Sequence, residues 1–461
     1  MRTIDSGSRA KARRCWAKTA TKRDAYTSST PPSNEGEDHS PPKVPDGAIL
    51  ASLPITGGSQ DLKESLAVYW SEEPSNSTAR FAYVMIHGRM RDGNDYWTTM
   101  NDALTSAVKA NYRNAFSSSI VVAPQFYSTR FNSGQYSSNQ LGWDDTNTWQ
   151  AGEKASHPQG TDVTSFDALD TFIDEFTDRS KYPAMEKIVF VGHGGGGQLL
   201  NRYAIVGKDA PEGSPVTIRW ISGDPSSSPY FTEQRPLNDT SVADKKTCPL
   251  YNTWRYGFDN FTGTQQGLKT PQEYFGQASK RDVRYIVGYQ DTSSDGDQEC
   301  MAKLQGGVAR RDRNLSWWRY INTLARTNED LTGFPGSFQG QEALPDWSGL
   351  SGGTLNHKLT VVRDADHDAA EVFGSDEGRS VLFDDDGQVA LGWRPSGWVQ
   401  RKSMGSSSSS SSSSTPTSSS ERSSSSSTSD GGTSAMARLV TPWMLVLTLL
   451  TLAILGSVLG I

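Results

Sequence analysis

Residues Glu186 to Val206 read EKIVFVGHGGGGQLLNRYAIV, and this segment decides the fold. Its residues 188–191 form a continuous apolar run, which is typical of a strand buried on both faces of a parallel sheet. Four consecutive glycines, 194–197, follow at once, and residues 198–204 favour helix over strand. The segment therefore predicts a central strand, a very tight turn and a helix.

Two kinds of site use such a turn. One is the nucleophile elbow, G-x-S-x-G, in which a serine sits on a strained turn above the sheet. Residues 192–196 read GHGGG, so the flanking glycines are in place and Gly194 stands where the serine would be. The other is the dinucleotide-binding loop, G-x-G-x-x-G, which residues 192–197 also match. The rest of the chain has to decide between them.

Further strands and helices alternate on both sides of this unit. We expect strands at residues 80–86, 119–123, 216–222, 284–290 and 358–362, with Pro124 ending the second of them. Residues 165–176 carry apolar side chains at helical spacing, and Thr164 or Ser165 can cap this helix. Strands that alternate with helices predict an α/β fold with a parallel sheet.

The polar residues that follow the later strands have an informative order. Asp291 follows the strand at 284–290, and His367 follows the last strand. Elbow, then acid, then histidine is the chain order of the α/β-hydrolases. Four short motifs occur in the same order: His-Gly at 87–88, Ala-Pro-Gln-Phe at 123–126, Ser-Phe-Asp-Ala-Leu at 165–169 and His-Asp-Ala-Ala at 367–370.

Over residues 50 to 390 the chain therefore resembles the α/β-hydrolase superfamily, and in particular fungal and bacterial hydrolase-like proteins. The resemblance implies an α/β-hydrolase fold, with a central, mainly parallel sheet flanked by helices. It also implies that His367 is the general base and Asp291 the acid that orients it. The N–H of Gly195 and one near Gly88 would form the oxyanion hole.

The glycine at the nucleophile position changes the expected chemistry. Gly194 has no side chain and cannot attack a carbonyl. Loss of the serine from such a triad typically costs about 10⁶-fold in rate. We therefore expect a hydrolase-like protein without serine-hydrolase catalysis, with room for a small-molecule ligand in the inherited pocket. For such a protein we expect no metal ion and no cofactor.

Three routes to activity stay open, and each would make the protein a hydrolase of an ester or a related bond. His193 could act as a nucleophile or an acid–base group, although a histidine packed beneath the elbow is the simpler explanation. A serine from residues 226–228 could reach the site. Water could be activated directly by His367 and Asp291.

The dinucleotide-binding alternative fits the chain less well. A Rossmann loop normally opens its domain, whereas several predicted strands precede residues 192–197. The acidic residue expected about 20 positions further on would be Glu212, which lies in the loop Pro-Glu-Gly-Ser-Pro. We keep this alternative as the lesser one.

Composition divides the 461 residues into four parts. Residues 1–47 are polar and aperiodic, and we expect them to be disordered. They lack the apolar stretch of a secretory signal; their basic composition faintly resembles an organelle transit peptide, but a disordered leader or a misplaced start codon is a simpler explanation. Residues 48–396 form the hydrolase-like domain, and residues 397–436 a serine-rich, disordered stalk.

Residues 437–461 form a hydrophobic tail that can span a bilayer. A serine-rich spacer followed by a terminal apolar segment matches a GPI-anchor signal, with Ser429, Asp430 and Gly431 as candidate attachment residues. A transmembrane helix that stays in the protein is the alternative. Both interpretations predict attachment to a membrane at the cell surface.

Two further features favour an extracellular domain. Four N-x-[ST] sequons are candidate glycosylation sites, namely Asn76, Asn238, Asn260 and Asn314. Cys248 and Cys300 are the two cysteines of the domain; they fit one disulfide, and two buried free thiols are the alternative. The formal net charge of −7 gives no reason to expect nucleic acid as a partner.

Overall fold

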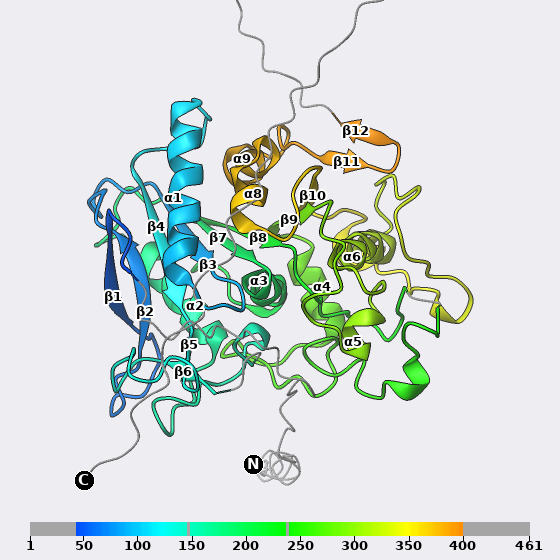
Figure 1. Cartoon of the computed structure of the whole chain (residues 1–461), viewed down its shortest axis with the longest axis horizontal. Coiled ribbons are helices and arrows are strands. Elements are labelled where there is room, and N and C mark those ends of the chain that lie inside the picture. The colour runs from blue at the N-terminus through cyan, green and yellow to red at the C-terminus, as the bar shows by residue number, and fades with distance from the viewer. Residues whose placement is uncertain (1–42, 145–147, 237–238, 400–461) are drawn as a thin grey trace, which may run out of the picture. The chain divides into compact units, whose positions relative to one another are not determined.

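The computed structural model describes residues 43–144, 148–236 and 239–399, and in this part of the chain ten strands form one sheet (Figure 1). From edge to edge the strands are β1 (Ala48–Pro54), β2 (Ser65–Ser71), β4 (Ser119–Gln125), β3 (Phe81–Ile86), β7 (Lys187–His193), β8 (Thr217–Gly223), β9 (Asp282–Gly288), β10 (His357–Val362), β11 (Gly392–Arg394) and β12 (Gly397–Val399). Neighbours from β4 to β11 are parallel, whereas the β1–β2, β2–β4 and β11–β12 pairs are antiparallel. A second, small sheet pairs β5 (Tyr127–Ser128) with β6 (Gly142–Trp143).

Helices cover both faces of the large sheet. Those of the described residues are α1 (Gly93–Lys109), α2 (Ser165–Thr177), α3 (Gly195–Val206), α4 (Pro271–Ala278), α5 (Cys300–Lys303), α6 (Arg310–Ala325), α7 (Ser348–Ser351), α8 (Ala369–Gly374) and α9 (Asp376–Phe383), with short 3-10 turns η1 (Thr148–Ala151), η2 (Lys245–Thr247) and η3 (Gly340–Glu342). Apolar side chains of α1, α8 and α9 share one core cluster with alternate residues of the strands. Those of α2, α3, α4 and α6 share the cluster on the other face.

This strand order is that of the α/β-hydrolase fold, and it confirms the predicted fold class. Two antiparallel strands lead in at one edge, β4 lies outside β3, and β7 occupies the middle of the sheet. Residues 188–191 of β7 are completely buried, as expected of a strand covered on both faces. The order differs from the 3-2-1-4-5-6 arrangement of dinucleotide-binding domains, so the fold does not support the alternative based on the G-x-G-x-x-G match.

Two local predictions can be compared directly with the structure. The helix expected at residues 165–176 is α2, and Thr164 caps it in a capping box with Asp167. The prediction that Pro124 ends a strand is wrong, because β4 continues to Gln125 and Pro124 pairs with Val68 of β2. The antiparallel β2 strand lies beside the end of β4, and there a proline is tolerated where its missing N–H is not needed for the ladder.

The far edge of the sheet extends beyond the expected end of the domain. We placed that end at residue 396, but Gly397–Val399 is β12 and pairs with β11. The intervening residues form a hairpin turn, which keeps the chain on the sheet for one more short strand. Residues 397–399, which we assigned to the stalk, therefore belong to the sheet.

The disulfide between Cys248 and Cys300 is confirmed. Its sulfur atoms are 2.01 Å apart and the two Cα atoms 5.9 Å apart. The bond joins the loop after β8 to α5, and Cys248 is fully buried in a small apolar cluster with Met301 and Leu304. This cluster is separate from the two that cover the sheet.

The four sequons have different surroundings. Asn76 and Asn260 are exposed, whereas Asn238 lies outside the described residues. Asn314 is buried in α6, and its side-chain nitrogen donates hydrogen bonds to the carbonyl oxygens of Pro225 and Arg310. A glycan on that nitrogen is incompatible with this packing, so the candidate site at Asn314 is wrong for the folded domain.

Several expectations fall on residues that the structure does not describe. They are the segment 1–42, most of the serine-rich stalk, the attachment candidates Ser429, Asp430 and Gly431, and the tail 437–461. Within the described residues, no helix combines the length and the apolar character that crossing a bilayer requires.

Candidate active site

The turn between β7 and α3 is built on close backbone contacts that only glycine permits. A Cβ atom on Gly192 would lie 2.4 Å from the carbonyl oxygen of Gly196, and one on Gly196 would lie 2.3 Å from that of Ile86. A Cβ on Gly197 would lie 2.1 Å from the carbonyl oxygen of Gly223. The helix therefore packs directly on the ends of β3, β7 and β8, which is the role of the flanking glycines in a nucleophile elbow.

Gly194 differs from these glycines because it has space beside it. Its φ of 55° and ψ of −110° hold the residue in the positive-φ turn that gives an elbow its shape. Among the described residues other than its two chain neighbours, a Cβ atom added there would meet only His367 within 4 Å, at 3.0 Å from Nε2 and 3.4 Å from Cε1. A side chain at this position would therefore point at the imidazole, as a nucleophilic serine does.

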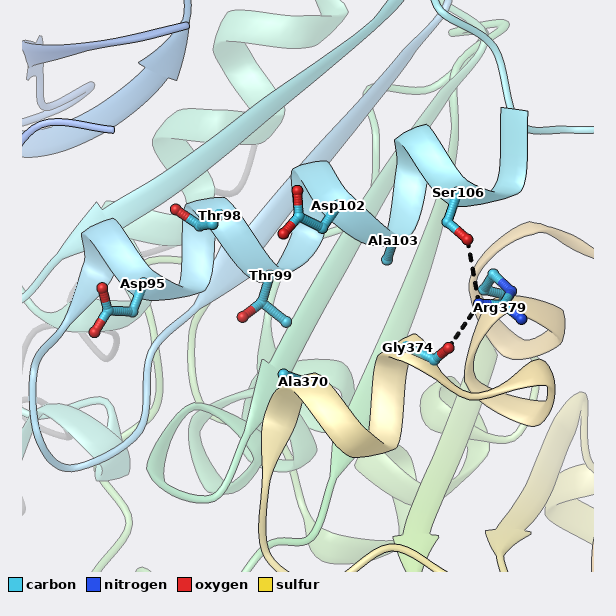
Figure 2. A pocket seen from close by; sticks show the side chains of 9 residues that line it. All are labelled: Asp95, Thr98, Thr99, Asp102, Ala103, Ser106, Ala370, Gly374 and Arg379. Atoms are coloured by element: carbon cyan, nitrogen blue, oxygen red, sulfur yellow. Dashed lines mark hydrogen bonds between the residues drawn. The ribbon is translucent and has the colours of Figure 1, made fainter. Parts of the chain in front are cut away.

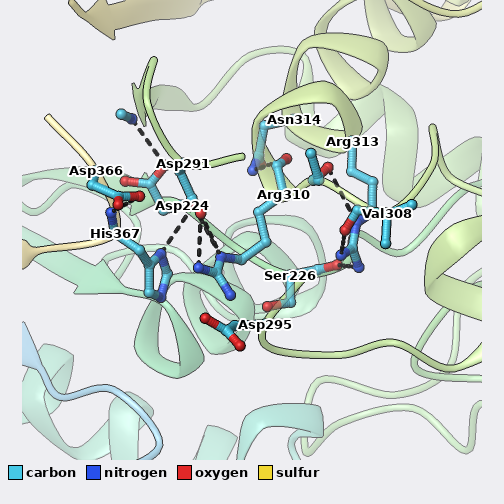
Figure 3. Close-up of polar contacts among 12 residues, drawn as sticks. Asp224, Ser226, Asp291, Asp295, Val308, Arg310, Arg313, Asn314, Asp366 and His367 are labelled. Atoms are coloured by element: carbon cyan, nitrogen blue, oxygen red, sulfur yellow. Dashed lines mark hydrogen bonds and ion pairs between the residues drawn. The ribbon is translucent and has the colours of Figure 1, made fainter. Parts of the chain in front are cut away.

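His367, Asp291 and Arg310 form a chain of polar contacts behind that space, as Figure 3 shows. The Nδ1–H of His367 donates to Asp291 Oδ2 at 3.0 Å, although the residues are 76 positions apart. Arg310, at the start of α6, donates from Nε to both carboxylate oxygens at 2.9 and 3.0 Å, and its Nη2 lies 2.7 Å from Oδ1. Asp291 is fully buried, and a buried charge needs a partner. The guanidinium of Arg310 supplies the opposite charge.

The ionisation of this pair suits a neutral imidazole beside a carboxylate. Burial and the neighbouring His193 lower the pKa of the His367 imidazole, and its hydrogen bond with Asp291 opposes them only in part. Burial raises the pKa of Asp291, but hydrogen bonds from His367 and Arg310 outweigh burial and hold that pKa below its ordinary value. Because Nδ1 carries the proton that Asp291 accepts, Nε2 is unprotonated, and this atom faces Gly194.

Two backbone N–H groups are candidates for the predicted oxyanion hole. One is that of Gly195, the first residue of α3, and the other is that of Arg89, which lies 3.1 Å from the position of a Cβ on Gly195. Among the described residues, neither N–H donates a hydrogen bond to another group. Gly88, where we expected the second donor, is the residue immediately before Arg89. The nitrogen of Arg89 thus lies close to the first residue of α3, next to the position where we expected the second donor.

His193 lies beside His367. The two ring centroids are 4.5 Å apart, and His193 is almost completely buried. Its Nε2 lies 3.3 Å from Oδ2 of Asp224, the residue that follows β8, and its Nδ1 lies 3.4 Å from the hydroxyl of Tyr96. We did not anticipate this contact from the sequence.

Asp224 and Arg310 are the polar residues that our sequence reasoning missed at this site. For Asp224 a signal existed, because carboxyl ends of neighbouring parallel strands meet at one edge, and Asp224 directly follows the strand after the elbow strand. For Arg310 there was none, since nothing in its local sequence shows that α6 begins beside Asp291.

The three serines considered as displaced nucleophiles do not contact His367. Ser227 donates to Gln198, and Ser228 accepts from Asn201. The hydroxyl of Ser226 lies on the Arg310 side of the site, since a Cβ on Gly296 would lie 2.6 Å from it and 2.7 Å from Arg310 Nη1. Within the described ranges, no hydroxyl group hydrogen-bonds to Nε2 of His367.

His87 holds the loop that carries Gly88 and Arg89. Its Nδ1 donates to the carbonyl oxygen of Gly88 at 2.7 Å, and its Nε2 accepts the N–H of Phe126 at 3.0 Å. Both nitrogens are thus used by a neutral ring. Burial lowers the pKa of His87 to about 3, with Arg91 adding to the effect and the hydrogen bond to Gly88 opposing it.

We expect acid to destabilise the domain through buried histidines. Burial also lowers the pKa of His357 to about 4, and its hydrogen bond to the Ala278 carbonyl opposes this only in part. The unfolded chain takes up these protons near pH 6.5 and the folded chain does not, so stability falls as the pH drops from about 6.5 towards 4. The free energy of unfolding in urea should be lower at pH 5 than at pH 7 by on the order of 2 kcal/mol for each histidine.

The matched variant for this test is His357→Gln. A glutamine amide can still donate to the Ala278 carbonyl, which His357 Nε2 contacts at 2.8 Å, but it does not titrate. In this variant, the decrease in unfolding free energy from pH 7 to pH 5 should be smaller by the contribution of one histidine. An unchanged loss in this variant would show that other groups cause the acid sensitivity.

A groove of about 480 Å³ lies near the site but does not include it (Figure 2). It runs between α1 and the α8–α9 segment, with Asp95 and Asp102 on one side and Ala370 and Arg379 on the other. Arg379 donates to Ser106 at 3.2 Å and to the carbonyl oxygen of Gly374 at 2.6 Å. None of the residues facing Gly194 lines this groove.

No family model matches the chain, and no curated protein matches it. Solved structures similar to it include a poly(3-hydroxybutyrate) depolymerase from Bordetella parapertussis, at 18% identity and a TM-score of 0.46, covering 74% of this chain and 94% of that one. A poly(aspartic acid) hydrolase from Sphingomonas sp. KT-1 matches at 16% identity and a TM-score of 0.44, covering 72% and 96%. An IroE-like serine hydrolase from Shewanella oneidensis matches at 13% identity and a TM-score of 0.38, covering 73% and 80%. The fold assignment rests on the strand order and the elbow, not on these distant likenesses.

Proposed function

We propose that this protein uses the α/β-hydrolase fold without serine-hydrolase catalysis. The observation that carries the proposal is the geometry at Gly194. This residue has no side chain, and a Cβ atom added to it would lie 3.0 Å from Nε2 of His367. The base and its orienting acid are within hydrogen-bond distance of each other, but the attacking atom is absent. Without it no acyl-enzyme intermediate can form at the elbow.

The preserved parts of the site support ligand binding in place of acyl transfer. The N–H groups of Gly195 and Arg89 offer two donors to a negatively polarised oxygen. The space beside Gly194 faces Nε2 of His367. A water molecule, or a small molecule that carries such an oxygen, fits this arrangement. The sequence resemblance to fungal and bacterial hydrolase-like proteins agrees with the fold.

The second candidate is a slow hydrolase that uses water as the nucleophile. The salt bridge from Arg310 to Asp291 favours it, because that contact keeps the imidazole oriented although no serine is present. In this alternative His367 would take a proton from water and the two N–H groups would hold the oxyanion. The substrate would be an ester or a related bond.

We also propose that the tail 437–461 attaches the protein to a membrane at the cell surface, through a GPI anchor or a transmembrane helix. The disulfide supports a location in the secretory pathway, because such bonds persist in oxidising compartments. The exposed sequons at Asn76 and Asn260 are open to glycosylation in the same setting.

The proposal is tested with a fluorophosphonate probe, which labels activated serines covalently. We expect no labelling of the folded full chain under conditions that label a serine esterase completely. The heat-denatured chain gives the background, and a Ser226→Ala variant tests the serine nearest to Arg310. Strong labelling of the native protein that a single serine substitution removes would overturn the proposal and reveal a displaced nucleophile.

A further inference from the structure

Three side chains from different strand ends converge beside Gly194 in a way that the sequence did not suggest. His193 ends β7, Asp224 follows β8 and His367 follows β10. One ligand atom from each lies within 4.8 Å of the other two. Two imidazoles and a carboxylate are a common zinc-binding set.

Two of these atoms are buried and lack hydrogen bonds. The side chains of His193 and Asp224 are 3% and 0% exposed, and their atoms Nε2 and Oδ2 face each other at 3.3 Å. Within the described residues, neither atom has a hydrogen-bond partner. Buried polar atoms rarely lack a hydrogen-bond partner, because each unsatisfied atom costs about 1–3 kcal/mol of folding stability. A ligand that bonds to both His193 Nε2 and Asp224 Oδ2 would remove that cost.

Each side chain is also held by a further contact, which is how metal ligands are usually oriented. Asp291 accepts from Nδ1 of His367, and the N–H of Gly288 donates to Oδ1 of Asp224 at 2.9 Å. The hydroxyl of Tyr96 lies near Nδ1 of His193. The atoms left over are Nε2 of both histidines and Oδ2 of the aspartate.

We propose that His193, Asp224 and His367 bind a divalent transition-metal cation, with zinc the best match to two imidazoles and one carboxylate. This inference rests on the proposed absence of a serine nucleophile, because a side chain on Gly194 would fill the space in front of His367 Nε2. Three protein ligands leave an open position, as in catalytic zinc sites, and that position can hold water.

The distances suit a tetrahedral site after a small adjustment. Ligands about 2.1 Å from zinc are about 3.4 Å from one another in a tetrahedron. The 3.3 Å between His193 Nε2 and Asp224 Oδ2 already matches one edge. The separations to His367 are at most 4.8 Å, so they exceed the tetrahedral edge by no more than about 1.4 Å. His367 is 29% exposed on the loop between β10 and α8, and a shift of its side chain would complete the site.

The experiment measures zinc bound to the EDTA-treated full chain, by equilibrium dialysis with elemental analysis and by titration calorimetry. We expect one zinc ion per chain, and at least a hundredfold weaker binding in Asp224→Asn and in His193→Gln. Asparagine keeps an oxygen for the Gly288 N–H, so Asp224→Asn should fold even if His193→Gln does not. His157→Gln is the matched control, because His157 lies outside the cluster and its Nδ1 contacts the Gln140 carbonyl.

Cobalt substitution gives a second readout. The visible absorption of bound Co²⁺ is intense in a four-coordinate site, and this intensity should vanish in Asp224→Asn and persist in His157→Gln. No stoichiometric zinc binding by the wild-type chain would overturn the proposal. Binding that both cluster variants retain would also overturn it, since the ion would then lie elsewhere.

Fluorophosphonate labelling of the same samples separates this inference from the proposed function. A chain that binds no zinc and is not labelled keeps the proposed function and loses the metal site. A chain that is labelled at a serine loses the proposed function, whatever its zinc content. The two failures therefore have different signatures.

Discussion

Gly194→Ser should create esterase activity in a protein that has almost none. The new hydroxyl would stand on the elbow in front of His367 Nε2. We expect at least a hundredfold rise in kcat/KM for a short-chain p-nitrophenyl ester, and new labelling by a fluorophosphonate. A hundredfold corresponds to about 2.7 kcal/mol of transition-state stabilisation.

The gain should stay well below the roughly 10⁶-fold contribution of a native serine. A Cβ atom at Gly194 would be 3.0 Å from His367 Nε2, so the imidazole must give way by a few tenths of an ångström. The positive φ of 55° adds strain of about 1–3 kcal/mol for any residue with a Cβ. Because a bound cation would occupy Nε2, the assay is run both after EDTA treatment and with zinc added.

Gly194→Ala is the matched control, since it carries the same backbone strain and Cβ contact without a hydroxyl. Gly194→Ser combined with His367→Gln tests whether the histidine acts as the base. Both controls should remain at background. A folded Gly194→Ser protein without activity or labelling would show that His367 is not aligned with the elbow, and the assignment of Gly194 to the nucleophile position would fail.

The fold was predictable because its signals are local. The apolar run at 188–191 and the glycines after it are adjacent in sequence, and they make the strand, the turn and the helix. The order of Gly194, Asp291 and His367 along the chain placed the two polar residues at the same sheet edge. The structure brings them within 3.0 Å of each other.

What sequence reasoning missed depends on lateral packing between elements. His193 and Asp224 meet because β7 and β8 are neighbours in register, and strand register cannot be derived from either strand alone. Arg310 and Asn314 lie on α6, a helix that buries polar side chains through specific partners. Since apolar periodicity detects only apolar faces, such a helix gives no signal of which residues it buries.

The contact between Arg310 and Asp291 should dominate the stability of the site. Among the described residues, Arg310→Ala leaves His367 as the remaining polar side-chain partner of the Asp291 carboxylate, which has no solvent exposure. Removing one partner of a buried ion pair typically costs about 3–5 kcal/mol, because the other charge stays buried. We expect a loss of that size in the free energy of unfolding in urea at pH 7.

Two variants separate this effect from a general sensitivity to arginine loss. Arg113→Ala removes an arginine whose contact with Asp385 is exposed, with side chains 71% and 49% accessible, and should cost less than about 1 kcal/mol. Arg310→Met combined with Asp291→Asn removes both charges and should recover much of the loss, because a neutral pair needs no counter-charge. Arg310→Ala would cost no more stability than Arg113→Ala in one case only: the Asp291 carboxyl would have to be neutral or hydrated in the folded protein. That result would contradict the assignment of Asp291 as the charged group that orients His367.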